Sequence, residues 1–118
     1  MGVFIGSVVL NVSNNSRAAR FWGEVLGYGP RPDNPDFLAP DGWSPPSASG
    51  LEHGAVHLHV DEDDRTHLDL WLDAGSDLDA EVERLISLGA TRVQWNHPED
   101  ADFVVLSDTE GNLFCVIS

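Results

Sequence analysis

The sequence predicts an α+β fold built from two successive βαβββ units, and two observations support this prediction. The order strand, helix, Leu-Gly break and further strands occurs twice, with a period of about sixty residues. In addition, a chain of 118 residues, 42% of them apolar, can bury roughly two thirds of its unfolded surface in one compact domain. We therefore expect a single domain whose halves span residues 1–64 and 65–118.

The first half begins with an apolar strand that contains "SVVLNV", from residue 7. An Asn- and Ser-rich stretch then predicts a helix start, because both residue types favour helix N-termini. One face of this helix carries Ala18, Phe21, Trp22 and Val25. The helix ends at "LGYG", and we expect a short strand at Pro30 to Arg31 and two more strands around "FLAPDG". The Pro/Ser/Gly-rich stretch "WSPPSASG" predicts an exposed loop.

The second half repeats this order from "HLDLWL", at residue 67. Ser76 and Asp79 have the spacing of a capping box, which predicts the start of the second helix. We expect its apolar residues to face inward: Leu78, Val82, Leu85 and Ile86. After the break at "LGA", a strand over Thr91 to Trp95 and a hairpin through "FVVLSDTEGNLFCVI" complete the unit, with Glu-Gly at the reversal.

Composition disfavours two classes of partner and indicates a compartment. Twenty acidic against six basic residues give a formal net charge of −14, which repels nucleic-acid phosphates and anionic lipids. We therefore expect no nucleic-acid partner and no membrane partner. Cys115 is the only cysteine, so no intrachain disulfide can form. The lone thiol and an apolar N-terminus without a basic leader predict a cytoplasmic protein.

Four short motifs resemble the vicinal oxygen chelate superfamily, and in particular its small branch of glyoxalase and bleomycin-resistance-like domains. In chain order they are "ARFWGEVLGY", "THLDLWL", "LISLGATRV" and "LSDTEGNLFCVI". The resemblance implies that the two βαβββ units curl into an incomplete β-barrel, with the helices outside and a cleft inside. It also implies that the site residues come from the first and last strands of each unit and face the cleft.

Applied residue by residue, the resemblance indicates which side chains line the cleft. Matching "SVVLNV" to "HLDLWL" makes Ser7 the counterpart of His67. Cys115 then stands where related enzymes often carry glutamate, and His57 is its counterpart in the first half. Strand residues alternate between faces, so Asp69 and Trp71 share the side of His67. The expected ligand-binding set is Ser7, His57, His67, Asp69, Trp71 and Cys115, and Trp43 and Trp95 are candidates to close the cleft mouth.

The residue types in this set argue against a metal cofactor. His57, His67 and Cys115 are of the types that bind zinc, and they form the alternative metal site. Ser7 is a poor fourth ligand, however, and the carboxylates that iron or manganese would prefer are missing from the matched positions. We therefore expect no metal, with a divalent ion such as zinc as the alternative.

Three functions are compatible with these observations. The preferred hypothesis is metal-independent binding of a small organic molecule, for which Trp71 offers an aromatic wall. The first alternative is a lyase, isomerase or dioxygenase that uses a metal or pairs His67 with Asp69 for acid–base catalysis. The second is a regulatory module whose cleft is vestigial. Uncovered sheet edges, together with the resemblance, also predict a homodimer.

Overall fold

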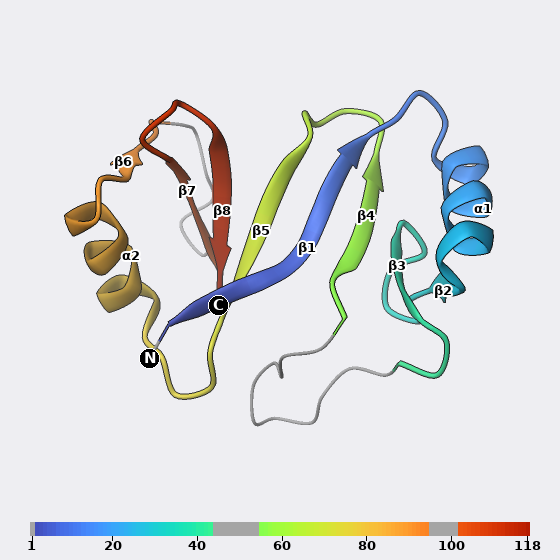
Figure 1. Cartoon of the computed structure of the whole chain (residues 1–118), viewed down its shortest axis with the longest axis horizontal. Coiled ribbons are helices and arrows are strands. Elements are labelled where there is room, and N and C mark those ends of the chain that lie inside the picture. The colour runs from blue at the N-terminus through green and yellow to red at the C-terminus, as the bar shows by residue number, and fades with distance from the viewer. Residues whose placement is uncertain (1, 44–54, 95–101) are drawn as a thin grey trace.

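The computed structural model describes residues 2–43, 55–94 and 102–118 of the chain. Each half contains a strand, a helix and three further strands in the predicted order (Figure 1). The first half comprises β1 (Val3–Asn11), α1 (Asn15–Leu26), β2 (Tyr28–Pro30), β3 (Phe37–Pro40) and β4 (His57–Asp61). The second half comprises β5 (His67–Leu72), α2 (Leu78–Ser87), β6 (Thr91–Arg92), β7 (Phe103–Ser107) and β8 (Leu113–Ile117). Two predicted features lie outside the described residues: the loop that follows Trp43, and the side chain of Trp95.

The eight strands of the described residues form one sheet, in the order β2-β3-β4-β1-β5-β8-β7-β6. At its centre β1 and β5 run antiparallel, and each lies parallel to the last strand of its own half, β4 and β8 respectively. The halves are therefore related by an approximate twofold axis between β1 and β5. The sheet curls without closing, because β2 and β6 stand at its two ends (Figure 1). The prediction of two βαβββ modules in an incomplete barrel is confirmed.

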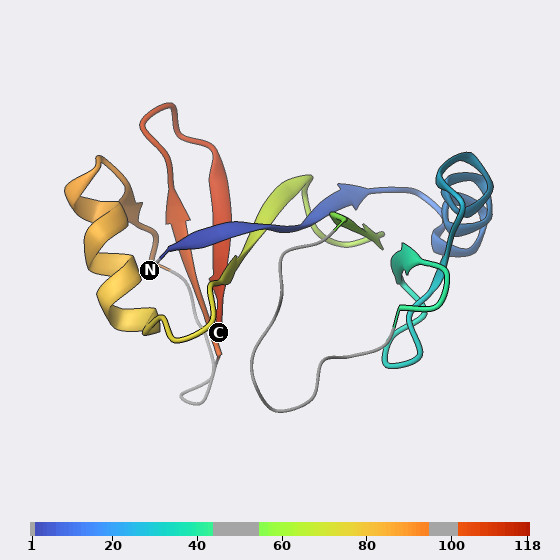
Figure 2. The same ribbon diagram turned by 60° about the horizontal axis from the view of Figure 1, so that its bottom comes forward.

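The helices lie at opposite ends of the molecule, outside the curl of the sheet (Figure 2). Helix α2 covers the main core, where Val82, Leu106 and Val116 are at most 1% exposed. Its other inward residues pack against this cluster, as predicted: Leu78, Leu85 and Ile86. The helical spacing of these side chains is thus what holds α2 on the sheet.

The start of α2 differs from the predicted capping box between Ser76 and Asp79, which is wrong. Asp77 is the N-cap, and its carboxylate accepts a hydrogen bond from the Ala80 N–H at 2.9 Å. Ser76 instead accepts a hydrogen bond from the Gly2 N–H at 3.2 Å, which ties the N-terminus to the second half. Both residues are good N-caps, and the long-range contact to Gly2 leaves Asp77 to cap the helix.

Helix α1 begins where the Asn/Ser-rich stretch predicts it. Asn14 is the N-cap and accepts a hydrogen bond from the Arg17 N–H at 2.9 Å. Its apolar face, however, is largely uncovered, since Phe21 and Val25 are 58% and 57% exposed and no residue of the helix is buried. The stripe predicted from the sequence therefore exists, but only Ala18 and Trp22 are partly buried. Neither α1 nor α2 is long and apolar enough to cross a membrane.

Candidate functional site

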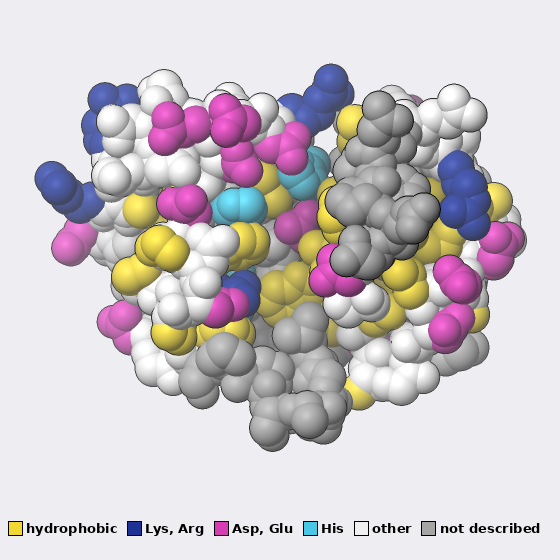
Figure 3. Space-filling model, turned by 180° about the vertical axis from the view of Figure 1, so that it is seen from behind, with side chains coloured by type: hydrophobic (Ala, Val, Ile, Leu, Met, Phe, Trp, Pro, Cys, Tyr) yellow, Lys and Arg dark blue, Asp and Glu magenta, His cyan; other side chains and the backbone are white. Residues whose placement is uncertain are grey.

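A row of directly paired residues crosses four strands at the centre of the sheet. Ser7 pairs with His57 of β4 on one side and with Asp69 of β5 on the other, and Asp69 pairs with Cys115 of β8. Directly paired residues project from the same face of a sheet, so these four side chains form the floor of one concave face. Figure 3 shows this face hollowed between the two halves, with histidine and acidic side chains around the hollow. Ser7, His57 and Asp69 are only 0%, 3% and 6% exposed.

Across β1 and β5, Ser7 pairs with Asp69, whereas His67, the counterpart of Ser7 in the sequence match, pairs with Val9. The register of β1 and β5 shifts between Ile5 and Ser7, which is the signature of a β-bulge at Gly6. The absence of a side chain at Gly6 lets the Trp71 indole lie directly against the backbone. Trp71 thereby becomes part of the cleft wall and is 8% exposed.

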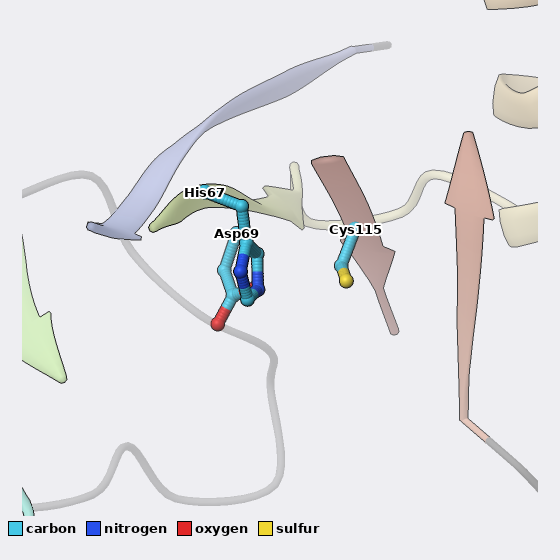
Figure 4. A group of neighbouring side chains, drawn as sticks. All are labelled: His67, Asp69 and Cys115. Atoms are coloured by element: carbon cyan, nitrogen blue, oxygen red, sulfur yellow. The ribbon is translucent and has the colours of Figure 1, made fainter. Parts of the chain in front are cut away.

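Four of the predicted site residues lie close together around Asp69: Ser7, His67, Asp69 and Cys115. His67 Nε2 lies 3.2 Å from Asp69 Oδ1, and the Ser7 hydroxyl donates a hydrogen bond to Asp69 Oδ2 at 3.2 Å. The possible ligating atoms of His67, Asp69 and Cys115 all lie within 4.8 Å of one another. Figure 4 shows the three side chains projecting to the same side from β5 and β8. Asp69 is the centre of this group.

The hydrogen bonds determine how protons are distributed in this group. His67 Nδ1 lies 2.7 Å from the Arg65 carbonyl, which can only accept, so Nδ1 carries a hydrogen. A hydrogen bond between His67 Nε2 and Asp69 then needs one further hydrogen, either on the imidazole or on the carboxyl. Burial raises the pKa of Asp69, although His67 and Ser7 oppose this effect.

Cys115 is a protonated thiol at neutral pH. Burial raises the pKa of its thiol to about 12, and the nearby negative charges of Asp69 and Asp64 add to the effect. Since the thiolate is the nucleophilic and metal-binding form, the raised pKa lowers the reactivity of this thiol.

His57 faces a different part of the cleft, in the first half. Its ring lies edge-on between Trp43 and Trp71, with centroid distances of 4.8 and 5.0 Å. Its Nδ1 lies 3.4 Å from Nη1 of Arg31. Burial lowers the pKa of His57, and the Arg31 charge lowers it further. The predicted metal set of His57, His67 and Cys115 is therefore not the one that converges, because Asp69 takes the place of His57.

The sequence reasoning missed Arg31 and the neighbouring stack of Phe37 on His59. The guanidinium carbon of Arg31 lies 4.8 Å above the Phe37 ring and 4.5 Å above Trp43. Phe37 stacks on His59 with ring centroids 3.9 Å apart, so this histidine is partly buried in the cleft wall. One signal in the sequence points to Arg31: it is the only basic residue between positions 21 and 64.

Comparison with known proteins identifies the family. The model of the glyoxalase-like domain family matches residues 7–117. No curated protein matches the chain significantly. Similar solved structures include the hypothetical protein SA1046 from S. aureus, with 18% identity, a TM-score of 0.38 and coverage of 92% of this chain and 91% of that one.

Two further structures carry the family in their descriptions. A glyoxalase/bleomycin resistance protein from Streptomyces sp. CB03234 has 20% identity, a TM-score of 0.33 and coverage of 93% of this chain and 96% of that one. A glyoxalase-related enzyme from Fulvimarina pelagi has 17% identity, a TM-score of 0.38 and coverage of 97% and 86%. Because the family model spans nearly the whole chain, this protein belongs to the glyoxalase-like domain family of the vicinal oxygen chelate superfamily, as its four motifs indicated.

Proposed function

We propose that this protein binds a small organic molecule in its cleft and needs no metal to do so. The observation that supports this best is the composition of the cleft floor. The polar side chains of Ser7, His57 and Asp69 are buried in this floor, and His57 lies against the aromatic rings of Trp43 and Trp71. Ligand sites in proteins combine such apolar and aromatic walls with a few placed polar groups.

The side chains near Asp69 fit a metal ion poorly. His67, Asp69 and Cys115 offer one ligand atom each, which is one short of the four protein ligands of a structural zinc site and would leave a water as the fourth ligand. Ser7 already donates its hydroxyl hydrogen to Asp69. Cys115 would have to bind as thiolate, which a thiol pKa of about 12 disfavours at neutral pH. We therefore infer a metal-free cleft, with zinc on these three residues as the alternative.

Elemental analysis of the purified protein, combined with melting in a chelator, tests the metal-free cleft. The expected result is no stoichiometric metal and an unchanged Tm. One equivalent of zinc or iron per chain, lost together with several degrees of Tm, would overturn the proposal and favour a metalloenzyme.

Native mass spectrometry of protein purified from its host tests ligand binding directly. We expect a small organic molecule to be retained under gentle conditions and lost on unfolding. Trp71→Ala should weaken its retention several-fold, because ring contacts of this kind contribute about 0.5–1.5 kcal/mol. Trp22→Ala on α1 is the matched control and should leave retention unchanged. Finding no ligand under any condition would favour the regulatory module with a vestigial cleft.

A second candidate function, acid–base catalysis, is favoured by the contact between His67 and Asp69. A hydrogen-bonded pair of this kind, at 3.2 Å, can exchange a proton with a bound molecule. Exchange of ligand hydrogen for deuterium in heavy water, followed by mass spectrometry, tests this candidate. His67→Gln should abolish the exchange and His59→Gln should preserve it. A retained ligand that exchanges no carbon-bound hydrogen would leave binding as the function.

We also propose that the chain forms a homodimer in the cytoplasm. The uncovered apolar residues Phe21 and Val25 on α1 support association, as do the edge strands β2 and β6. The free thiol of Cys115 supports a reducing compartment. Light scattering should report twice the chain mass, and Phe21→Asp should shift it toward monomer. Monomer alone, at concentrations well above micromolar, would contradict the dimer.

A further inference from the structure

We propose that Arg31 and His57 form an anion subsite at the first-half end of the cleft, and that the ligand is therefore an aromatic carboxylate. The proposal rests on the ligand-binding function inferred above and names the chemical class of the ligand. It follows from how Arg31 is held, which of its donors are free, and what lies at the opposite end of the cleft.

Arg31 is held rigidly before any ligand binds. Its Nε donates to Asp33 Oδ1 at 2.9 Å, and its Nη2 donates to the other carboxylate oxygen of Asp33. The guanidinium is also stacked between Phe37 and Trp43. Only 15% of the side chain is exposed. A guanidinium fixed in this way loses little conformational entropy when it binds an anion.

Several hydrogen-bond donors remain in the subsite. A guanidinium has five N–H groups, of which Asp33 takes two and His57 Nδ1 takes one. The other two have no hydrogen-bond partner among residues 2–43, 55–94 and 102–118. Because Arg31 can only donate, His57 accepts at Nδ1 and carries its hydrogen at Nε2, which adds a third donor. Donors beside aromatic rings are the chemistry that recognises a carboxylate on an aromatic ring.

The charge distribution favours a monoanion. The net charge of −14 repels anions at long range, but charges farther apart than about 8 Å are largely screened at physiological ionic strength. Within the described chain, Arg31 is the only basic side chain that contacts a cleft residue. The negative charge of Asp33 offsets part of the positive charge of Arg31, because the two side chains form an ion pair. A carboxylate therefore suits this subsite better than a doubly charged phosphate.

The opposite end of the cleft explains why one aromatic ring is the right size. His57 lies on β4 and Asp69 on β5, with β1 between them. Two strand spacings separate these residues by roughly 10 Å, which a single ring with a substituent at each end spans. A carboxylate bound to Arg31 would therefore present the far substituent to the contact between His67 and Asp69. Trp71, between the two ends, would contact the ring.

Titration calorimetry with matched acids and amides tests the subsite. The probes are benzoate, 4-hydroxybenzoate and 2-naphthoate, each with its neutral amide. We expect the acids to bind roughly ten- to a hundredfold more tightly than the amides, because hydrogen bonds to charged groups are the stronger ones. Arg31→Gln should remove this preference and leave amide binding unchanged. Arg31→Lys should keep part of it, and Arg17→Gln on α1 should keep all of it.

Each other outcome counts against a defined part of the proposal. Equal affinity for acids and amides in the unmodified protein would overturn the anion subsite and leave cleft binding intact. Arg31→Gln weakening acids and amides equally would show that Arg31 only supports the cleft wall, which also overturns the subsite. Failure of every acid to bind, in a protein that retains a small molecule by native mass spectrometry, would overturn the aromatic carboxylate as the ligand class and leave the ligand-binding function intact. If Arg31→Gln does not fold by circular dichroism, the preference of Arg31→Lys decides, and an unreduced preference there contradicts a bidentate guanidinium contact.

Discussion

Gly6→Ala is expected to push Trp71 out of the cleft wall. A Cβ at position 6 would lie 2.0, 2.2 and 2.2 Å from three atoms of the indole, whereas carbon atoms in contact prefer about 3.5–4.0 Å. The indole must therefore move by about 1.5 Å, which disturbs its edge contacts with Phe4 and His57 at centroid distances of 5.9 and 5.0 Å. Overpacking of this kind costs about 1–3 kcal/mol of stability.

Urea unfolding and tryptophan emission measure this effect, and a double-mutant cycle assigns it. Gly6→Ala should lower the free energy of unfolding by about 1–3 kcal/mol and shift the emission to the red, as an indole that is now 8% exposed gains water. In a Trp71→Ala background the same change should cost nothing, because the clashing ring is gone. An equal cost in both backgrounds would place the strain in the backbone bulge and refute the reasoning.

Three further predictions concern titration, the core and the thiol. Burial lowers the pKa of His57 and of His59, so the unfolded state takes up protons at a higher pH than the folded state does. The Tm should therefore fall as the pH drops below 6.5, and it should fall less in His57→Gln. A Tm that does not change with pH in this range would contradict the burial of the two histidines. Leu106 is 0% exposed, and Leu106→Ala should lower the free energy of unfolding in urea by about 2–5 kcal/mol. Leu88 is 67% exposed, and Leu88→Ala should change this free energy by no more than about 0.5 kcal/mol. Similar losses in the two variants would contradict the placement of the core. Cys115, with a thiol pKa of about 12 against an ordinary 9.0, should react with iodoacetamide about a thousandfold more slowly in the native protein than in urea, and equal rates would contradict its environment.

The βαβββ repeat and the inward face of α2 could be predicted from the sequence, because both depend on local patterns. Alternating apolar residues specify strands, and the spacing of Leu78 and Val82 specifies the side of the helix that meets the sheet. The four motifs also identified the family that the comparisons show. Ser7, His57, Asp69 and Cys115 share one face of the sheet, and alternation within each strand is the local pattern that predicts such shared faces.

The pairing of strands was decided only by the tertiary structure. The bulge at Gly6, with Trp71 lying against it, shifts the register of β1 against β5 by one residue, and the pairing beyond the bulge places Asp69 opposite Ser7. Register depends on contacts between segments more than fifty residues apart, which no local pattern contains. The same holds for Arg31, whose contact with His57 joins positions 26 residues apart. The local sequence therefore determines where strands form and which side chains share a face of each strand. The hydrogen bonds of the site depend on packing between the two halves and within the first half.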